Sequence, residues 1–220
     1  TQAVAAFLLA MSVSSWVVLA WKAWLLRRAR VDVARCTAAF WQAPDLARAR
    51  EQLALFDRER LVLPLVEATD APAAGALAAA GERAQQLTRG LRDALHQAAD
   101  RLQFGQVLLA TVGSTAPFVG LLGTVWGIYH ALVGIGAAGQ VSIDQVAGPV
   151  GEALVMTAAG LAVALPAVLG YNIFGRRIAR LEADLEGFAF DLRDLLAPAG
   201  GAAAHDDTPA LDPAASLEAA

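Results

Sequence analysis

The stretch AGPVGEALVMTAAGLAVALPAVLGYN, residues 147–172, decides the fold class of this chain. Glu152 is its only charged side chain. A helix of about 20 apolar residues crosses the hydrocarbon core of a bilayer, so the stretch predicts a transmembrane helix. Arg176, Arg177 and Arg180 follow it, and basic residues are typical of the cytoplasmic end of such a helix.

The composition also indicates a membrane protein. The 220 residues are 57% hydrophobic and 17% charged, whereas soluble domains are about 45–50% apolar and about a quarter charged. This disfavours a cytosolic enzyme and a disordered chain. With 17 Lys and Arg against 21 Asp and Glu, no basic excess points to nucleic acid. The single cysteine, Cys36, cannot form an internal disulfide, and the sequence predicts neither a metal site nor a cofactor.

Two further runs without formal charge predict two more spans. Residues 1–21 are apolar and precede Lys22 and a group of arginines, which indicates a retained anchor, because a signal peptide carries its positive charge first. We expect the long stem of Lys22 to let its ammonium group snorkel to the cytoplasmic interface. The chain begins with Thr1 rather than Met, so residues upstream stay an open question. Residues 102–143 exceed one span and end in a glycine-rich segment, which predicts a hairpin.

The prediction is therefore an all-α integral membrane protein with three transmembrane helices, the second and third extended into a cytoplasmic helical bundle. We expect an amphipathic helix over residues 73–106 to continue without a break into the second span. The third span should likewise continue to Leu196, through apolar residues at Ile178, Leu181, Leu185, Phe188, Leu192 and Leu195. The expected divisions are a first transmembrane helix 1–26, a cytoplasmic helical segment 27–101, a second transmembrane helix 102–135, an outer hairpin 136–147, a third transmembrane helix 148–175, a cytoplasmic helix 176–196 and a disordered tail 197–220.

The basic residues predict the orientation of these spans. Arginines follow the first span, precede the second and follow the third, so all three clusters fall on one side. The hairpin around Gly139 contains no Lys or Arg. By the positive-inside rule, the hairpin and the N-terminus lie outside and the C-terminus lies in the cytoplasm.

Both of the later spans carry a stripe of small residues at alternating spacings of four and three. In lipid, small residues let two helix backbones approach closely, so helix packing is one interpretation and pore lining in a ring of subunits is the other. The stripes comprise Gly113, Pro117, Gly120, Thr124, Gly127, Ala131 and Gly134 in the second span, and Ala153, Thr157, Gly160, Ala164 and Ala167 in the third.

Each stripe contains one hydroxyl in its middle, Thr124 or Thr157. If the two helices are antiparallel, these hydroxyls lie at nearly the same depth and would form a polar belt around a ring of chains. In the alternative, each hydroxyl bonds only a carbonyl of its own helix.

Glu152 is the only acidic side chain inside a span. Such a residue usually faces a cavity, a partner or an ion path, although a carboxylate near the outer end of a span can also lie in water. About 140° around an ideal helix separates Glu152 from Thr157, so the two cannot share one narrow face. We expect Glu152 at a seam between neighbouring subunits. His130 lies near the outer boundary, which favours an interfacial role over a proton relay.

Two segments resemble the signatures of one family. Residues 113–128, GSTAPFVGLLGTVWGI, resemble the second-span signature of the ExbB/TolQ proton-channel family, which is more distantly related to MotA. Residues 147–161, AGPVGEALVMTAAGL, followed by LPAV at 165–168 and by Tyr171 and Asn172, resemble its third-span signature. The segment GYNIF at 170–174 looks closer to ExbB than to TolQ, and MotA is disfavoured because that branch has four spans.

The resemblance implies a proton-channel motor subunit of the bacterial inner membrane, with a periplasmic N-terminus and no enzymatic activity. Such subunits form a pentameric ring around transmembrane helices of an ExbD-like or TolR-like partner that carries an essential aspartate. Proton flow drives rotation that energises a TonB-like transducer and thereby outer-membrane transport, or, for a TolQ-type subunit, the Tol-Pal envelope-maintenance system. The residues matching Thr124, Glu152 and Thr157 line or border the proton path. Two other functional classes are a membrane scaffold that only holds a partner and an intramembrane enzyme. For an enzyme, the sequence offers no converging nucleophile, base or metal ligands.

Overall fold

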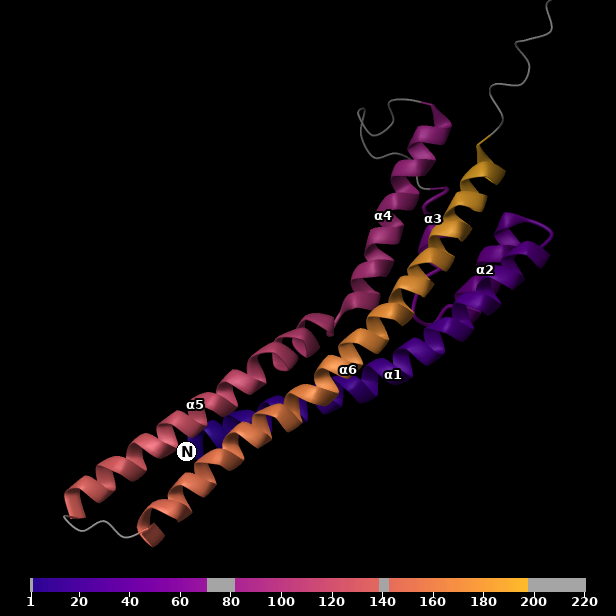
Figure 1. Ribbon diagram of the computed structural model, residues 1–220. Coiled ribbons are helices and arrows are strands. Elements are labelled where there is room, and N and C mark those ends of the chain that lie inside the picture. Colours follow the sequence, from indigo (N-terminus) through magenta and orange to yellow (C-terminus); the bar gives the residue numbers. More distant parts are fainter. Residues whose placement is uncertain (1, 71–81, 139–142, 198–220) are drawn as a thin grey trace, which may run out of the picture.

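The computed structural model describes residues 2–70, 82–138 and 143–197, and these residues are helical apart from short connections (Figure 1). The all-α prediction is confirmed. Three helices are long and apolar enough to cross a membrane, as expected. The helices are α1 (Gln2–Gln42), α2 (Leu46–Phe56), α3 (Leu63–Glu67), α4 (Arg83–Gln103), α5 (Gln106–Ala138) and α6 (Ile143–Leu196).

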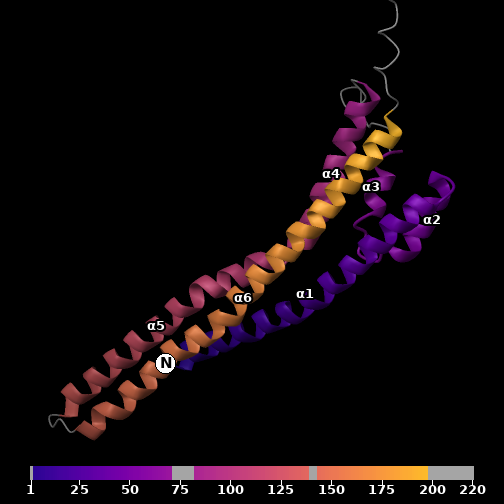
Figure 2. The same ribbon diagram turned by 45° about the vertical axis from the view of Figure 1, so that its right-hand side comes forward.

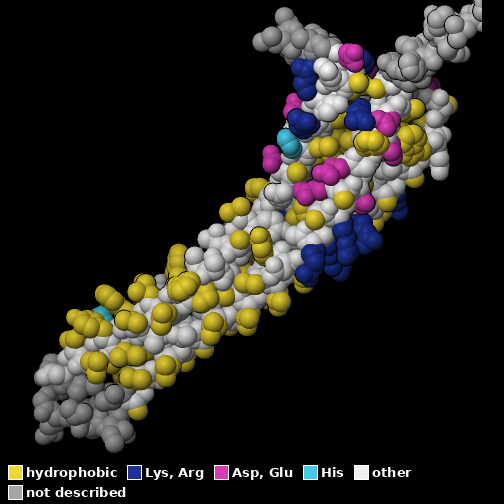
Figure 3. All heavy atoms as spheres, turned by 45° about the horizontal axis from the view of Figure 1, so that its top comes forward, with side chains coloured by type: hydrophobic (Ala, Val, Ile, Leu, Met, Phe, Trp, Pro, Cys, Tyr) yellow, Lys and Arg dark blue, Asp and Glu magenta, His cyan; other side chains and the backbone are white. Residues whose placement is uncertain are grey.

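The molecule is an elongated rod in which α5 and α6 form an antiparallel pair and α1 runs beside them, parallel to α6 (Figures 1 and 2). The 54 residues of α6 correspond to a length of about 80 Å, so this helix passes through both halves of the rod. Apolar side chains cover the half formed by α5 and the first part of α6, whereas acidic and basic residues gather in the other half (Figure 3). The connection at 139–142, the first part of the predicted amphipathic helix at 73–81, and residues 198–220 of the predicted tail 197–220 lie outside the described residues.

The apolar core of the molecule continues into the half of the rod that carries the charges, around the second part of α6. Five of the six apolar positions predicted there are buried at helical spacing, but Leu195 is 56% exposed. The ring of Phe188 packs edge-on against Phe40 of α1, with 5.1 Å between the ring centroids. Leu91 of α4 belongs to the same core. The prediction that the third span continues as one helix to Leu196 is confirmed, because this core stabilises it beyond the apolar segment.

The first helix is longer than its apolar segment. α1 continues through the arginines to Gln42, two residues before Pro44, and a proline disfavours the helical conformation of the residue that precedes it. Its later turns bury Val33 and Cys36 against the same core. The polar segment of the chain therefore begins inside α1 rather than in a separate helix.

The predicted continuous helix from the polar segment into the second span is wrong at one point. α4 ends at Gln103 and α5 begins at Gln106. Between them Gly105 has a φ of +82°, a conformation that glycine adopts without steric cost. Phe104 has a non-helical ψ of 132°, and its ring lies edge-on to Trp21 of α1, with 5.7 Å between the ring centroids.

Lys22 occupies this break, and the prediction that its ammonium group snorkels to the interface is wrong. The side chain is fully buried, and Nζ donates hydrogen bonds to the carbonyl oxygen of Leu102 and, at 2.5 Å, to that of Phe104. The last carbonyls of a helix have no partner within it, and a cation near them is favourable. Lys22 thus caps the C-terminus of α4 and joins α1 to the start of the second span.

Candidate functional site

The seam between α5 and α6 is built on contact between the two backbones. A Cβ atom on Gly160 would lie 2.6 Å from the carbonyl oxygen of Ala116 and 3.0 Å from the Cα of Gly120. A Cβ atom on Gly120 would lie 2.7 Å from the carbonyl oxygen of Met156. These distances leave no room for a side chain, so glycine at both positions is what lets the helices approach so closely.

The other residues of the two stripes extend this seam. A Cβ atom on Gly113 would lie 2.6 Å from Cγ2 of Val168. Pro117 is half-buried and α5 continues through it. Within one chain the two stripes therefore face one another along most of their length, whereas a Cβ atom on Gly134, at the far end, would contact nothing. The remaining stripe residues in buried positions are Gly127, Ala153, Ala164 and Ala167.

A pair of hydroxyl groups lies in the middle of the seam. The hydroxyl of Thr124 contacts the hydroxyl of Thr157, so the structure places both side chains at one depth. Thr124 Oγ1 also lies 3.1 Å from the carbonyl oxygen of Gly120 in its own helix and 3.1 Å from that of Ala153 in α6. Thr124 is 8% exposed and Thr157 is half-buried, so the pair can be reached from one side. The hydroxyl pair therefore joins the two helices. The alternative prediction, that each hydroxyl bonds only a carbonyl of its own helix, accounts for only one of the contacts of Thr124.

Glu152 lies apart from the two threonines. It is on α6, about a turn and a half before Thr157, and it is exposed while Thr157 faces the seam. Its neighbours Leu154 and Val155 are 58% and 59% exposed. A carboxylate on an apolar membrane surface is costly unless it faces water or a partner group. No ion pair of Glu152 is present within the described part of the chain.

The surfaces around the hydroxyl pair and Glu152 are apolar and uncovered in the single chain. Side chains of this kind need lipid or another protein surface in contact with them. One chain therefore contains only part of any path that these groups line. The exposed apolar residues include Phe118, Leu121, Leu122, Val125 and Trp126 on α5, and Leu161, Leu165 and Leu169 on α6.

His130 lies on α5 about two turns before the C-terminal end of this helix at Ala138. Its side chain is exposed, its Nδ1 atom lies 3.0 Å from the carbonyl oxygen of Trp126, and its ring centroid lies 4.9 Å from that of Trp126. It makes no contact with the threonine pair among the interactions that the structure describes.

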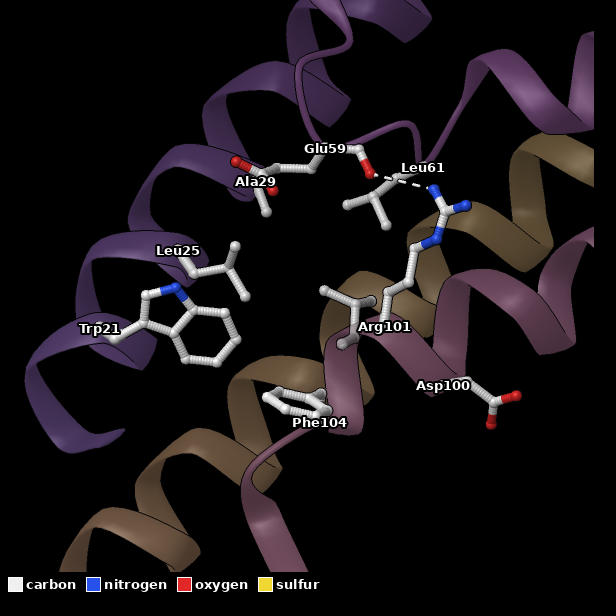
Figure 4. Close-up of a pocket in the computed structure, with 9 residues that line it drawn as sticks. Trp21, Leu25, Ala29, Glu59, Leu61, Asp100, Arg101 and Phe104 are labelled. Carbon is white, nitrogen blue, oxygen red and sulfur yellow. Dashed lines mark hydrogen bonds between the residues drawn. The ribbon is translucent and has the colours of Figure 1, made fainter. Parts of the chain in front are cut away.

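A cavity of about 430 Å³ lies beside the α4–α5 break (Figure 4). The indole of Trp21, the side chain of Leu25 and the ring of Phe104 surround it, and Arg101 closes one side (Figure 4). Arg101 donates a hydrogen bond to the carbonyl oxygen of Arg60 at 3.1 Å. The cavity brings no set of reactive groups together. Over residues 2–70, 82–138 and 143–197, no group of three or more His, Cys, Asp or Glu side chains could hold a metal ion.

The amino-acid sequence did not indicate the role of Lys22 or the break beside it. A lysine at the end of an apolar run is usually an interfacial anchor, so its position alone did not indicate a buried cap. Gly105, at the point where the polar segment meets the apolar one, was the signal that could have indicated the break.

Comparison with known proteins gives consistent matches. The model of the MotA/TolQ/ExbB proton channel family matches residues 64–187. The chain is 46% identical over 199 residues to the biopolymer transport protein ExbB of Xanthomonas campestris pv. campestris, which covers 86% of this chain and 79% of the relative. It is 57% identical over 102 residues to ExbB of Neisseria gonorrhoeae, 46% of each chain. It is 30% identical over 213 residues to the Tol-Pal system protein TolQ of Haemophilus influenzae, which covers 89% of this chain and 88% of the relative.

Proposed function

We propose the following function for this chain, which belongs to the MotA/TolQ/ExbB proton channel family. It is the channel-forming motor subunit of an ExbB–ExbD type complex in the bacterial inner membrane. The complex uses the proton motive force to energise a TonB-like transducer, and thereby outer-membrane transport. The N-terminus lies in the periplasm and the C-terminus in the cytoplasm. Higher identity to proteins named ExbB than to TolQ supports this role over that of a TolQ-type subunit.

The observation that carries the proposal is the hydroxyl pair of Thr124 and Thr157. In the middle of a seam made of glycine and alanine, this pair is a polar group that can accept and donate hydrogen bonds. Thr157 is only half-buried, so the pair is open toward one side of the α5–α6 unit. A proton path needs such groups at membrane depth, where ionisable and polar residues mark ion pathways.

Glu152 supplies the titratable group of the proposed path. It projects from α6 into apolar surroundings and has no partner in its own chain among the described residues. In a ring of copies, the exposed faces of α5 and α6 would be covered by neighbouring chains and by the helices of an ExbD-like subunit. Glu152 would then lie at a seam between subunits, and the threonine pairs would form a polar belt around the enclosed helices. A pentamer is the assembly that we propose.

The experiment replaces Glu152 by Gln and measures proton flux in proteoliposomes that contain the chain and its ExbD-like partner. Glu152→Gln keeps the shape of the side chain and removes its charge, so flux and energised transport should be lost while ring assembly is kept. Glu186→Gln is the control, because Glu186 is an exposed carboxylate of the same helix outside the apolar segment. Full activity of Glu152→Gln would refute the proposal and favour a scaffold.

The hydroxyl pair is tested separately. The double variant Thr124→Val with Thr157→Val keeps the volume of both side chains and removes both hydroxyls, and we expect reduced proton flux. The control is Thr111→Val with Thr115→Val, because these exposed hydroxyls bond only carbonyls of their own helix, at 2.8 Å and 2.7 Å. Equal flux in the two double variants would mean that the central hydroxyls only hold the helices together.

Complementation separates the two candidate systems. If the chain restores outer-membrane uptake of iron chelates to a strain that lacks its own ExbB but does not restore envelope integrity to a strain without TolQ, the ExbB-type role holds. The reverse result would assign the chain to the TolQ type.

A further inference from the structure

Four arginines from two helices line one groove. Arg27 and Arg30 come from α1, and Arg177 and Arg180 come from α6. The two clusters are about 150 residues apart in the sequence, and the parallel packing of α1 on α6 brings them together. The groove has a volume of about 590 Å³, and the rest of its lining is Leu26, Leu181, Ala183 and Asp184.

These four arginines have no acidic partner, in contrast to Arg28 beside them. Arg28, the neighbour of Arg27, lies 3.8 Å from Asp32 and 3.5 Å from Glu59. None of the four groove arginines forms an ion pair with any residue that the structure describes, and all four are exposed. Asp184 lies in the lining but not within ion-pair distance of them. The groove therefore has a formal charge of three positive units, from four guanidinium groups and one carboxylate.

The groove lies where the apolar part of the rod ends. Arg27 comes one turn after Trp24, whose indole is 56% exposed, and Arg177 comes one turn after Ile173, which is 41% exposed. In Figure 3 a patch of basic side chains lies between the apolar section and the section in which acidic and further basic side chains are mixed. Exposed tryptophan beside arginine is typical of the boundary between hydrocarbon and headgroups.

We propose that this groove binds the phosphate headgroup of an anionic phospholipid from the leaflet on the arginine side. Guanidinium groups bind phosphate oxygens through paired, charge-assisted hydrogen bonds, and arginine is well suited to phosphate for this reason. The acyl chains would lie along the exposed apolar surfaces of α1 and α6, which begin one turn away. An anionic lipid is favoured over a zwitterionic one because the groove has a net positive charge that its own chain does not neutralise. This inference does not rest on the proposed proton path.

The test measures lipid binding to the full chain, purified in detergent in the assembly that it forms. Native mass spectrometry with added phosphatidylglycerol or phosphatidylcholine, both with the same acyl chains, gives the two affinities. The groove variant is Arg30→Gln with Arg180→Gln. Each arginine near a headgroup contributes about fivefold in affinity, so the double variant should bind phosphatidylglycerol about 25-fold more weakly. The control, Arg35→Gln with Arg92→Gln, removes two exposed arginines outside the groove and should change the affinity less than about twofold.

Four outcomes would overturn the proposal. They are equal affinity of the native chain for both lipids, an equal loss in both double variants, no loss in the groove variant, and displacement of the lipid by millimolar inorganic phosphate. The last would mean that the groove recognises a soluble anion rather than a lipid. Size-exclusion chromatography checks that the variants assemble. If the groove variant does not assemble, the variant Arg30→Lys with Arg180→Lys replaces it, because lysine keeps both charges but not the paired hydrogen bonds. This lysine variant should show an intermediate loss of lipid affinity. Unchanged affinity would contradict the role of these arginines.

Discussion

The contact between the α5 and α6 backbones at Gly160 gives a prediction whose size follows from the structure. A Cβ atom there would lie 2.6 Å from the carbonyl oxygen of Ala116, whereas ordinary contacts begin at 3.4 Å. The helices must therefore separate by up to 0.8 Å, the difference between these values, to accept alanine. Overpacking of this kind costs about 1–3 kcal/mol of the free energy of unfolding. The separation would also lengthen the contact between Thr124 and Thr157, which lies one turn from Gly160 on α6 and one turn from its other neighbour, Gly120, on α5.

Gly175→Ala is the matched control, because a Cβ atom on Gly175 of the same helix would meet nothing within 4 Å. Both variants gain the same helix propensity, up to about 1 kcal/mol for alanine over glycine, so the difference between them isolates the overpacking. The assay is reversible unfolding in mixed detergent micelles, followed by tryptophan fluorescence. We expect Gly160→Ala to have a free energy of unfolding lower than that of Gly175→Ala by about 1–3 kcal/mol. Equal stability of the two variants would refute the close contact of the α5 and α6 backbones.

Three further predictions concern the part of the chain outside the α5–α6 seam. Lys22→Met removes the charged cap of α4 and should lower the free energy of unfolding by about 2 kcal/mol. Arg30→Met, at an exposed position of α1, the helix that also contains Lys22, should change this free energy little. Burial, and then two nearby carboxylates, raises the pKa of Cys36 to about 12, so a maleimide at pH 8 should label the unfolded chain but not the folded one. Because this pKa is raised on folding, the thiol's contribution to stability is complete below about pH 9 and is lost as the pH rises toward about 12; denaturation across this range should show a loss that Cys36→Ala lacks. Asp57→Ala should lower the free energy of unfolding by about 2 kcal/mol or more, because the Asp57 carboxylate accepts hydrogen bonds from three backbone N–H groups. Asp45→Ala removes one such hydrogen bond, at the N-cap of α2, and should lower it by about 1 kcal/mol.

The membrane spans could be predicted because lipid imposes a simple condition on the sequence. A backbone in hydrocarbon must satisfy its own hydrogen bonds, and a helix with about 20 apolar residues does so. The failures lie where a helix meets another helix. The residues around Gly105 have a helical pattern on both sides, so the pattern alone predicted a continuous helix. The packing of Phe104 on Trp21 and the cap from Lys22 stabilise the break instead.

The candidate site was only partly accessible to sequence reasoning. The midpoint between Thr124 and Thr157 in the chain predicted their equal depth, because an antiparallel pair of helices brings residues equidistant from their connection together. The separation of Glu152 from the threonines followed from helical periodicity. Contact between the two hydroxyls, however, also requires both helices to be rotated so that the stripes face one another.

From the sequence alone, then, it followed that this protein has three apolar helices, that basic residues mark one end of each, and that Glu152 is the lone carboxylate within a span. These features depend on composition and on distance along the chain. Only the tertiary structure decided that the small residues of α5 and α6 meet each other, that Lys22 is buried as a cap, and that arginines about 150 residues apart form one groove. The physical reason is that these features depend on the rotation and relative shift of whole helices. Many side-chain contacts along α1, α5 and α6 determine that arrangement together, and no short segment specifies it.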